Sequence, residues 1–357
     1  MQIIDGKKIA DKLNSELKLK IGSLKNELEL SLVVIIVGSN PASNIYVKNK
    51  EKKAYEIAKS EGIKPQLFQN MVNFVESVKN FCFKDADIVF LATTSEVSKS
   101  ISDHIKKVSS CIIIDNSSYF RMKEDIPLVV PEVNSSSLDN IAKPSIICNP
   151  NCSTIQMLLV LKPIHDLFKV RRVIVSTYQA VSGSGRAGEN ELESQTHNYV
   201  KSEHLSNNTF PKQIFCNVIP HIDVFMEDGT TKEEQKMTQE TNKILDTDIL
   251  VHANCARVSV LNAHAEYINI ETVKPFDLKE INAVIKNAPG VKLEDSQENY
   301  RTPLDVSGKD EVFVSRVRKD YTSDNSISLW CVADNLRKGA ALNAIQIAET
   351  LITKNIL

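Results

Sequence analysis

The hydrophobic pattern of the first sixty residues alternates between helical and extended periods. Residues 8–30 place apolar side chains at three- and four-residue intervals, which predicts an amphipathic helix. The apolar run of residues 32–37, LVVIIV, predicts a short buried strand. A second helix is expected over 41–62, because Pro41 suits a first helical position and Gly62 can end the helix.

Strands and helices continue to alternate between residues 86 and 181. The apolar runs 86–93 and 111–118 predict strands, and the segment 95–110 between them predicts a helix. A strand, helix and strand in this order indicate a parallel sheet. Further elements are expected in the order strand, strand, helix, strand, over residues 127–134, 144–151, 152–168 and 171–181.

The pattern changes after about residue 210, where strands with inward and outward alternation predominate. Such strands are expected at residues 256–271, 311–320 and 326–334, with a polar helix over 232–245. We therefore expect a second domain with a mixed sheet. The final segment, 338–354, is strongly amphipathic and is expected to return as a helix to the first domain.

The composition favours a small-molecule partner. Of 357 residues, 42% are hydrophobic and 25% are charged, and the formal net charge is −2 from 43 basic and 45 acidic residues. This balance provides no general basic field for nucleic acid or a membrane surface. The N-terminal segment has charges within its apolar stretch, and no run approaches a membrane span, so a cytoplasmic location is expected.

The seven cysteines are scattered, with no CxxC pair and no zinc spacing, so we expect reduced thiols, mostly buried, and no metal site. Cys152 stands out because the segment NPNCSTIQMLL places it where a strand ends and a helix begins. The free N–H groups and the dipole at a helix N-terminus can stabilise a thiolate, lower its pKa and hold an oxyanion. Cys148 lies in the preceding strand and is expected to be structural.

The segment CNPNCSTIQM resembles the active-site segment of aspartate-semialdehyde dehydrogenases, which reduce β-aspartyl phosphate with NADPH. Further segments resemble that family in the family's order and cover about residues 80–357; they read IIIDNSSYFRMKEDIPLVVPEVN, TYQAVSGSGR, NVIPHID, TKEEQKM, ARVSVLNAHAE and DNLRKGAALNAIQIAE. The resemblance implies a cytoplasmic homodimeric oxidoreductase of lysine, threonine, methionine and diaminopimelate biosynthesis. Its ligands would be β-aspartyl phosphate, aspartate semialdehyde and phosphate.

The resemblance also implies an α/β fold of two domains. The first would be Rossmann-like, with a parallel sheet and an atypical first strand and helix, and the second would be a mixed α+β domain for catalysis and dimerisation. The expected boundaries are 1–57 for an N-terminal segment of different origin, 58–148 for the remainder of the NAD(P)-binding domain, 149–335 for the catalytic and dimerisation domain, and 336–357 for the returning helix.

Residue roles follow from the same resemblance. Cys152 would be the nucleophile and His264 the acid and base. The substrate would be held by six residues: Arg121 and Asn151 at the phosphate, Gln179 at the thiol, Glu233 with Lys236 at the polar end, and Arg257 at the α-carboxylate. NADP would contact Gly183, Gly185 and Asn335.

The chemistry itself calls for such a set. A doubly anionic acyl phosphate favours the bidentate guanidinium groups of Arg121 and Arg257 over lysine. Arg257 and His264 are an odd number of residues apart and would face opposite sides of one regular strand, so a bulge or bend is expected between them. In the implied mechanism His264 assists deprotonation of Cys152, the thiolate displaces phosphate, and a hydride reduces the thioester.

The segment GSGRAG, residues 183–188, formally fits a dinucleotide fingerprint. The family resemblance instead places this loop beside the substrate glutamine and the nicotinamide. The family's N-terminal GATGxVG turn is absent, and ATTSEVSKS carries Thr94 and Ser95 where the family has small glycines. These departures concern cofactor binding rather than the Cys–His chemistry, because a backbone without glycine cannot approach a pyrophosphate closely.

Residues 1–57 resemble the start of bifunctional methylenetetrahydrofolate dehydrogenase/cyclohydrolases, through IIDGKKIADKL, VVIIVGSNPAS and IYVKNKEKKAYEI. Tyr46 and Lys50, four residues apart on one helix face, match that family's folate-site tyrosine and lysine. The chain thus resembles a chimera. Two alternatives to an active semialdehyde dehydrogenase stay open, a folate enzyme and a catalytically silent dimer that does not bind NADP.

Overall fold

The structure of the chain, a computed structural model, describes residues 33–34, 82–294, 296 and 298–357. The helices expected over 8–30 and 41–62 lie outside the described residues. Tyr46 and Lys50 lie outside them too, as does the folate-like segment apart from residues 33–34.

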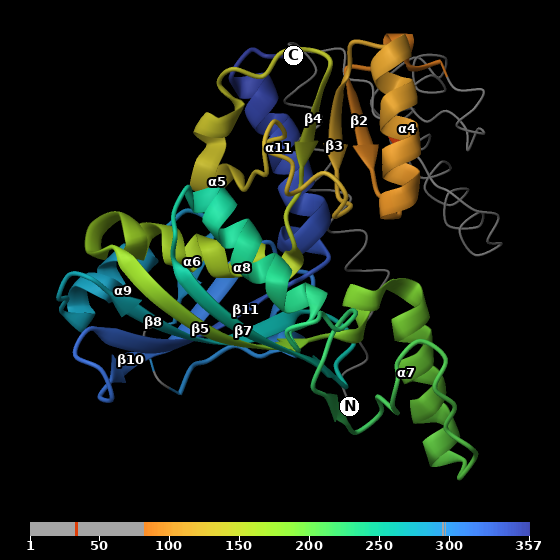
Figure 1. The fold of residues 1–357 in the computed structure, drawn as a ribbon. Helices are drawn as coiled ribbons and strands as arrows, with labels where there is room; N and C mark the ends of the chain where they lie inside the picture. The colour runs from red at the N-terminus through yellow and green to blue at the C-terminus, as the bar shows by residue number, and fades with distance from the viewer. Residues whose placement is uncertain (1–32, 35–81, 295, 297) are drawn as a thin grey trace, which may run out of the picture.

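A parallel sheet forms the centre of the first domain (Figure 1). Its order is β1-β2-β3-β4, and the strands are Val33–Val34, Ile88–Leu91, Ile112–Asp115 and Ser145–Cys148. All four residues of β3 are buried, as expected for a parallel strand that is covered on both faces.

Helices cover both faces of this sheet. Helix α4 (Ser95–Val108) packs Ile101 and Ile105 against one face. Helix α11 (Leu342–Thr353) covers the other face, where Ile347 and Leu351 join the isoleucines of β2, β3 and β4 in one buried cluster. The C-terminal helix therefore returns to the first domain. A π-helical turn, Arg337–Ala341, leads into it.

The second domain is built on a mixed seven-stranded sheet in the order β6-β7-β5-β8-β11-β10-β9. The strands, in chain order, are β5 Val170–Gln179, β6 Val218–Ile219, β7 Leu250–Val258, β8 His264–Thr272, β9 Val291–Leu293, β10 Val312–Asp320 and β11 Ser326–Ala333. The pairs β5–β7 and β9–β10 are parallel and the others are antiparallel. The predicted α/β fold, a parallel-sheet domain followed by a mixed one, is confirmed.

Three helices cover one face of this sheet, α6 (Cys152–Phe168), α8 (Lys232–Leu245) and α9 (Leu278–Lys286) (Figure 1). Helix α7 (Gly185–Val200) projects beside the sheet, and α5 (Pro131–Asn134) and α10 (Pro303–Val306) are single turns. The largest hydrophobic cluster runs from α4 and β2 through α6 into the second sheet. The two domains thus share a continuous core, and α6 lies at their junction.

The strand expected over 127–134 is wrong. Leu128 forms an isolated parallel bridge with Cys148, and the chain then turns into α5. Pro131 occupies the start of this helix, and the Asn134 side chain binds the backbone N–H of Val130 at 2.9 Å. The proline at the start of the turn and the bond from the Val130 N–H back to the Asn134 side chain therefore outweighed the apolar run.

The single strand expected over 256–271 is also wrong. The chain forms two strands, β7 and β8, with a reversal between them in which Ala263 has a φ of 73°. Strand β5 lies between β7 and β8 in the sheet. The break predicted between Arg257 and His264, a bulge or a bend, takes the form of a bend that separates β7 from β8.

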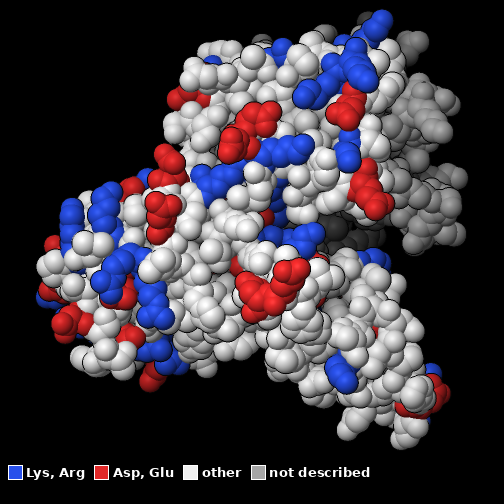
Figure 2. All heavy atoms as spheres, viewed as in Figure 1, with Lys and Arg blue, Asp and Glu red and all other residues white. Residues whose placement is uncertain are grey.

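Acidic and basic side chains are interspersed over the face shown in Figure 2. Among the described residues, no helix is long and apolar enough to cross a membrane.

Candidate active site

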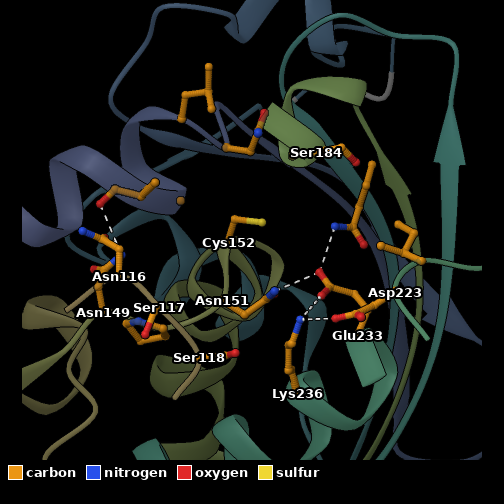
Figure 3. Close-up of a pocket in the computed structure, with 18 of the residues that line it drawn as sticks. Asn116, Ser117, Ser118, Asn149, Asn151, Cys152, Ser184, Asp223, Glu233 and Lys236 are labelled. Atoms are coloured by element: carbon orange, nitrogen blue, oxygen red, sulfur yellow. Dashed lines mark hydrogen bonds and ion pairs between the residues drawn. The ribbon is translucent and has the colours of Figure 1, made fainter. Parts of the chain in front are cut away.

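A cavity of about 510 Å³ opens where the two domains meet at the N-terminus of α6 (Figure 3). Residues from both domains line it. All predicted catalytic and substrate residues contribute to this wall except His264, which is fully buried behind Gly183. The lining includes Ser95, Ser118, Arg121, Asn151, Cys152, Gln179, Gly183, Asp223, Glu233, Lys236, Arg257, Asn335 and Gly339.

Cys152 is the first residue of α6, as the sequence predicted. Asn151 caps this helix, since its side-chain oxygen accepts hydrogen bonds from the N–H groups of Ser153 and Thr154 at 3.0 and 3.2 Å. Burial and the Glu233 carboxylate nevertheless raise the pKa of the Cys152 thiol to about 12. The lowered pKa expected at a helix N-terminus is therefore wrong for the protein alone, because burial and Glu233 outweigh the nearby positive charges.

Arg257, Gln179 and His264 lie in one row across three neighbouring strands. Gln179 at the end of β5 pairs in register with Arg257 on β7. Tyr178 pairs with Ala265 on β8, so Gln179 and His264 are the next residues along the same ladder. Because residues that are opposite in a ladder point to the same face, the three side chains share one face of the sheet.

The backbone of Ala180 holds both ends of this row. Its N–H donates to Nδ1 of His264 at 3.0 Å, and its carbonyl accepts from Arg257 at 2.7 Å. Burial, followed by repulsion from Arg257, lowers the pKa of His264 to about 3. His264 is therefore neutral. Since Nδ1 accepts a hydrogen bond, the ring proton belongs on Nε2, which has no protein partner among the described residues.

Glu233 connects the polar residues of the cavity (Figure 3). Its Oε1 accepts from the side-chain amides of Asn151 and Gln179 at 2.8 and 3.1 Å. Its Oε2 binds Lys236 at 3.0 Å, and Lys236 also binds Asp223 at 2.8 Å. Burial disfavours the charged carboxylate, but Lys236 and the two amides outweigh burial and lower the pKa of Glu233 to about 2.

Arg121 reaches the cavity from the loop after β3. Its guanidinium donates to Glu240 at 2.9 Å and to the carbonyl of Asn116 at 2.8 Å, and Nε has no partner among the described residues. The residue is 8% exposed. Arg121 lines the cavity and its bonds to Glu240 and Asn116 use one hydrogen on each terminal nitrogen, so the remaining hydrogens there can bind an anion.

The three predicted cofactor residues have different surroundings. Gly183 lies against the row of Arg257, Gln179 and His264, since a Cβ there would be 2.8 Å from Arg257 and 3.1 Å from His264 Nε2. Gly185 has a φ of +70° and open space around it. Asn335 accepts from the N–H of Ala263 at 2.9 Å and donates to the Ser182 hydroxyl at 3.0 Å. It therefore holds the segments of Ala263 and Ser182 together at the cavity wall.

The cavity at the thiol, about 510 Å³ with Cys152, Gly183 and Asn335 in its wall, has the volume to admit a planar ring beside the substrate. Ser95 and Ser118 lie further along the same wall, with their hydroxyl oxygens 3.2 Å apart. Within the described part of the chain, no group of three or more His, Cys, Asp or Glu side chains could hold a metal ion.

Three residues that contact the site were not predicted from the sequence. Glu240 binds both Arg121 and the backbone of Asn151, Asp223 binds Lys236, and Gly339 contacts Cys152. The helical spacing of Glu233, Lys236 and Glu240 could have indicated one shared face. No sequence pattern indicated the other two contacts. The seven cysteines are free, and Cys111, Cys148, Cys255 and Cys331 are buried.

Comparison with known families agrees with this arrangement. The family model for the semialdehyde dehydrogenase NAD-binding domain matches residues 21–141. The family model for the semialdehyde dehydrogenase dimerisation domain matches residues 161–338. Together they define the class, a nucleotide-binding domain followed by the dimerisation domain of semialdehyde dehydrogenases. The first match overlaps the segment 1–57 from residue 21 onward.

Individual relatives narrow the class. Aspartate-semialdehyde dehydrogenase of Aquifex aeolicus (strain VF5) is 46% identical over 308 residues, which cover 85% of this chain and 90% of the relative. The crystal structure of aspartate semialdehyde dehydrogenase II from Vibrio cholerae, complexed with ASA, is 43% identical with a TM-score of 0.75, over 78% of this chain and 83% of that one. The enzyme of Candida albicans, solved with NADP, is 25% identical with a TM-score of 0.61, over 76% and 79%.

The chain belongs to the aspartate-semialdehyde dehydrogenase family. The predicted resemblance over residues 80–357 is thus confirmed, and with it a place in amino-acid biosynthesis. The resemblance of residues 1–57 to folate enzymes, with Tyr46 and Lys50, stays a prediction from the sequence.

Proposed function

We propose that the chain is an active NADP-dependent aspartate-semialdehyde dehydrogenase, which converts β-aspartyl phosphate into aspartate semialdehyde and phosphate. One observation carries this proposal. The Cys152 thiol, at the start of α6, shares its cavity with Gln179 and Arg257, and His264 completes their row. Such a set can hold an acyl group, attack it and protonate the product.

The charges of the cavity match the two anionic ends of the substrate. We infer that Arg257 binds the α-carboxylate and Arg121, with Asn151, the phosphate. Glu233 and Lys236 would bind the polar end, where the carboxylate can accept from the α-ammonium group. Asn151 already caps α6 and donates to Glu233, so its remaining amide hydrogen is the one available to phosphate.

The first step needs a thiolate, although the pKa of the Cys152 thiol is about 12 in the protein alone. The thiolate attacks the acyl carbon, the carbon–oxygen bond to phosphate breaks, and phosphate leaves with that electron pair. Cys152 then carries a thioester. Gln179 orients the acyl group. The N–H groups of Ser153 and Thr154 already donate to the Asn151 side chain, so the backbone N–H of Cys152 is the donor at the start of α6 that is left for the acyl oxygen.

His264 enters this scheme as a hydrogen-bond donor through Nε2, because the ring is neutral and its Nδ1 accepts from Ala180. NADPH, when bound, would supply the hydride that reduces the thioester. The Nε2–H of His264 can stabilise the oxyanion that forms; the carbon–sulfur bond then breaks as the aldehyde forms, and the Cys152 thiolate leaves with that electron pair and takes a proton from solvent. The expected assistance of His264 in deprotonating Cys152 would require the other tautomer.

NADP is the proposed cofactor. The Candida albicans relative was solved with NADP, and the cavity of about 510 Å³ at the thiol has the volume for a ring beside the substrate. We place Gly183, Gly185 and Asn335 at the nicotinamide end.

We also propose a homodimer. The dimerisation-domain match supports it, as does an aromatic group on the face of the second sheet opposite α6, where Trp330 lies between Tyr178 and Tyr267 at ring distances of 6.0 and 5.0 Å. The domain boundaries at residues 57, 148 and 335, a cytoplasmic location and the lack of a nucleic-acid or membrane partner remain proposals from the sequence.

A spectrophotometric assay tests the function. Aspartate semialdehyde, phosphate and NADP should yield NADPH with the wild-type protein, and omission of phosphate should stop the reaction. Cys152→Ala should abolish it, and His264→Asn should lower kcat by about 10²- to 10⁴-fold. A stable dimer that fails to bind NADPH would favour the catalytically silent alternative.

A further inference from the structure

Helix α8 connects the active site to the loop that carries Arg121. Four of its charged residues recur at intervals of three and four positions, so they share one face of the helix; they are Glu233, Lys236, Glu240 and Lys243. The first two line the cavity, whereas Glu240 and Lys243 lie outside its lining. The second pair therefore acts on the site through other residues.

Glu240 joins two candidate phosphate-binding residues. One carboxylate oxygen accepts from the Arg121 guanidinium at 2.9 Å, and the other accepts from the backbone N–H of Asn151 at 2.6 Å. Glu240 is 1% exposed, and both contacts are buried. Arg121 belongs to the first domain, and Asn151 is the cap of the nucleophile's helix, so one carboxylate fixes their separation.

Lys243 holds the same loop one turn further along. Its ammonium group donates to the carbonyls of Arg121, Lys123 and Ile126 at 2.7, 2.6 and 2.8 Å. These three bonds use the full donor capacity of a lysine. The loop is therefore tied to α8 through its backbone as well as through the Arg121 side chain.

We propose that Glu240 and Lys243 are positioning residues that hold the Arg121 loop against the N-terminus of α6, and so assemble the phosphate subsite across the domain boundary. This inference rests on the proposed function, in which Arg121 and Asn151 bind phosphate. Without Glu240, the buried guanidinium loses its carboxylate and the Asn151 N–H loses its acceptor. Both groups must then shift to find partners.

Glu240→Gln is the sharpest variant, because it keeps the size of the side chain. An amide has only one acceptor oxygen, so it can serve Arg121 or Asn151 but presents N–H groups to the other. Glu240→Asp keeps the charge and loses one methylene. Glu349→Gln, on an exposed position of α11, is the matched control.

The test determines two constants separately in the oxidation of aspartate semialdehyde by NADP: KM for phosphate and KM for aspartate semialdehyde. Glu240→Gln should raise KM for phosphate about tenfold or more and change KM for aspartate semialdehyde by less than about threefold. Glu240→Asp should recover part of this loss. Lys243→Met should raise the same KM by about threefold or more, although Lys243 lies outside the cavity. The control should match the wild type.

A second readout does not depend on turnover. Inorganic phosphate should slow alkylation of Cys152 by iodoacetamide in the wild type, and Glu240→Gln should need about tenfold more phosphate for the same protection. If the wild type turns over but Glu240→Gln shows the control's KM for phosphate, the positioning role is wrong and the proposed function stands.

If the wild type shows no turnover, the proposed function fails. The phosphate-protection curves then test the positioning role of Glu240 on their own. A curve shifted to higher phosphate in Glu240→Gln supports the positioning role. Superimposed curves, or no protection of the wild type by phosphate, overturn it.

Discussion

Gly339 packs against Cys152 so closely that a Cβ on the glycine would lie 2.8 Å from the Cβ and 3.3 Å from the Cα of the cysteine. The contact is made by the π-helical turn Arg337–Ala341. Lys338 anchors that turn, since its buried ammonium binds both Glu132 oxygens at 2.8 and 2.7 Å. The C-terminal segment thus fixes the position of Cys152, although the two are far apart in the sequence.

Gly339→Ala should therefore displace Cys152. The expected loss in kcat/KM is about 100-fold or more, since small misplacements of reacting groups cost this much. The measurement is steady-state kinetics, with Gly229→Ala as the control, because a Cβ at Gly229 would meet no atom within 4 Å. Gly229 has a φ of +83°, which an alanine adopts with strain, so Gly229→Ala should lose about 1 kcal/mol of stability with unchanged kcat/KM. Normal kinetics in Gly339→Ala would contradict the packing role.

Gly183→Ala should perturb the catalytic row instead. Its Cβ would lie 2.8 Å from the Arg257 guanidinium and 3.1 Å from His264 Nε2, so the flexible Arg257 side chain must move away. We expect KM for aspartate semialdehyde to rise about tenfold, with KM for phosphate changed little. An equal rise in both would argue against an Arg257 role confined to the carboxylate end.

The thiol of Cys152 should react slowly at neutral pH. Its pKa is raised to about 12, so the thiolate fraction and the rate of alkylation should increase with pH well beyond the usual range of a free cysteine. Glu233→Gln removes a nearby negative charge and should shift this profile to lower pH. The pH dependence of iodoacetamide alkylation, monitored by mass spectrometry at Cys152, provides the measurement. A profile centred near the free-cysteine pKa would contradict the buried environment.

Acid should destabilise the protein in two windows. His264 has its pKa lowered to about 3, so the unfolded chain takes up a proton first, and stability falls as pH decreases from 6.5 toward 3. Glu233 has its pKa lowered to about 2, so its contribution is present above 4.5 and is lost as pH falls toward 2.

Urea unfolding at about pH 7 and about pH 5 tests the first window, and a parallel measurement on His264→Asn separates the contribution of His264 from that of the other groups that titrate there. The wild type should lose roughly 1–2 kcal/mol more than His264→Asn over this interval. Equal losses in both proteins would show that His264 is not held neutral in the fold.

The local elements of the fold could be predicted where the sequence has strong periodicity and clear ends. Helix α6 begins at Cys152 and helix α8 spans 232–245, as the sequence predicted. The predictions failed at 127–134 and 256–271. In the first, a proline at a helix start and a bond from Val130 to the Asn134 side chain overrode an apolar run. In the second, one alternating pattern contains two strands that a bend separates, and β5 lies between them in the sheet.

The identities of the site residues came from the family resemblance, whereas their arrangement came from the fold. No spacing in the sequence shows that Arg257, Gln179 and His264 form one row, because the row depends on pairing among three strands. Glu240 was missed for the same reason. Its partners, Arg121 and Asn151, are more than eighty residues away in sequence.

The central claim is that Cys152 carries the acyl group in a phosphate-dependent dehydrogenase. The most direct measurement is NADPH formation from aspartate semialdehyde, NADP and phosphate, followed in parallel for the wild type and for folded Cys152→Ala. We predict saturable, phosphate-dependent turnover in the wild type and none in the variant. Equal turnover in the two proteins, or a folded wild type that forms no NADPH at any phosphate concentration, would contradict the account.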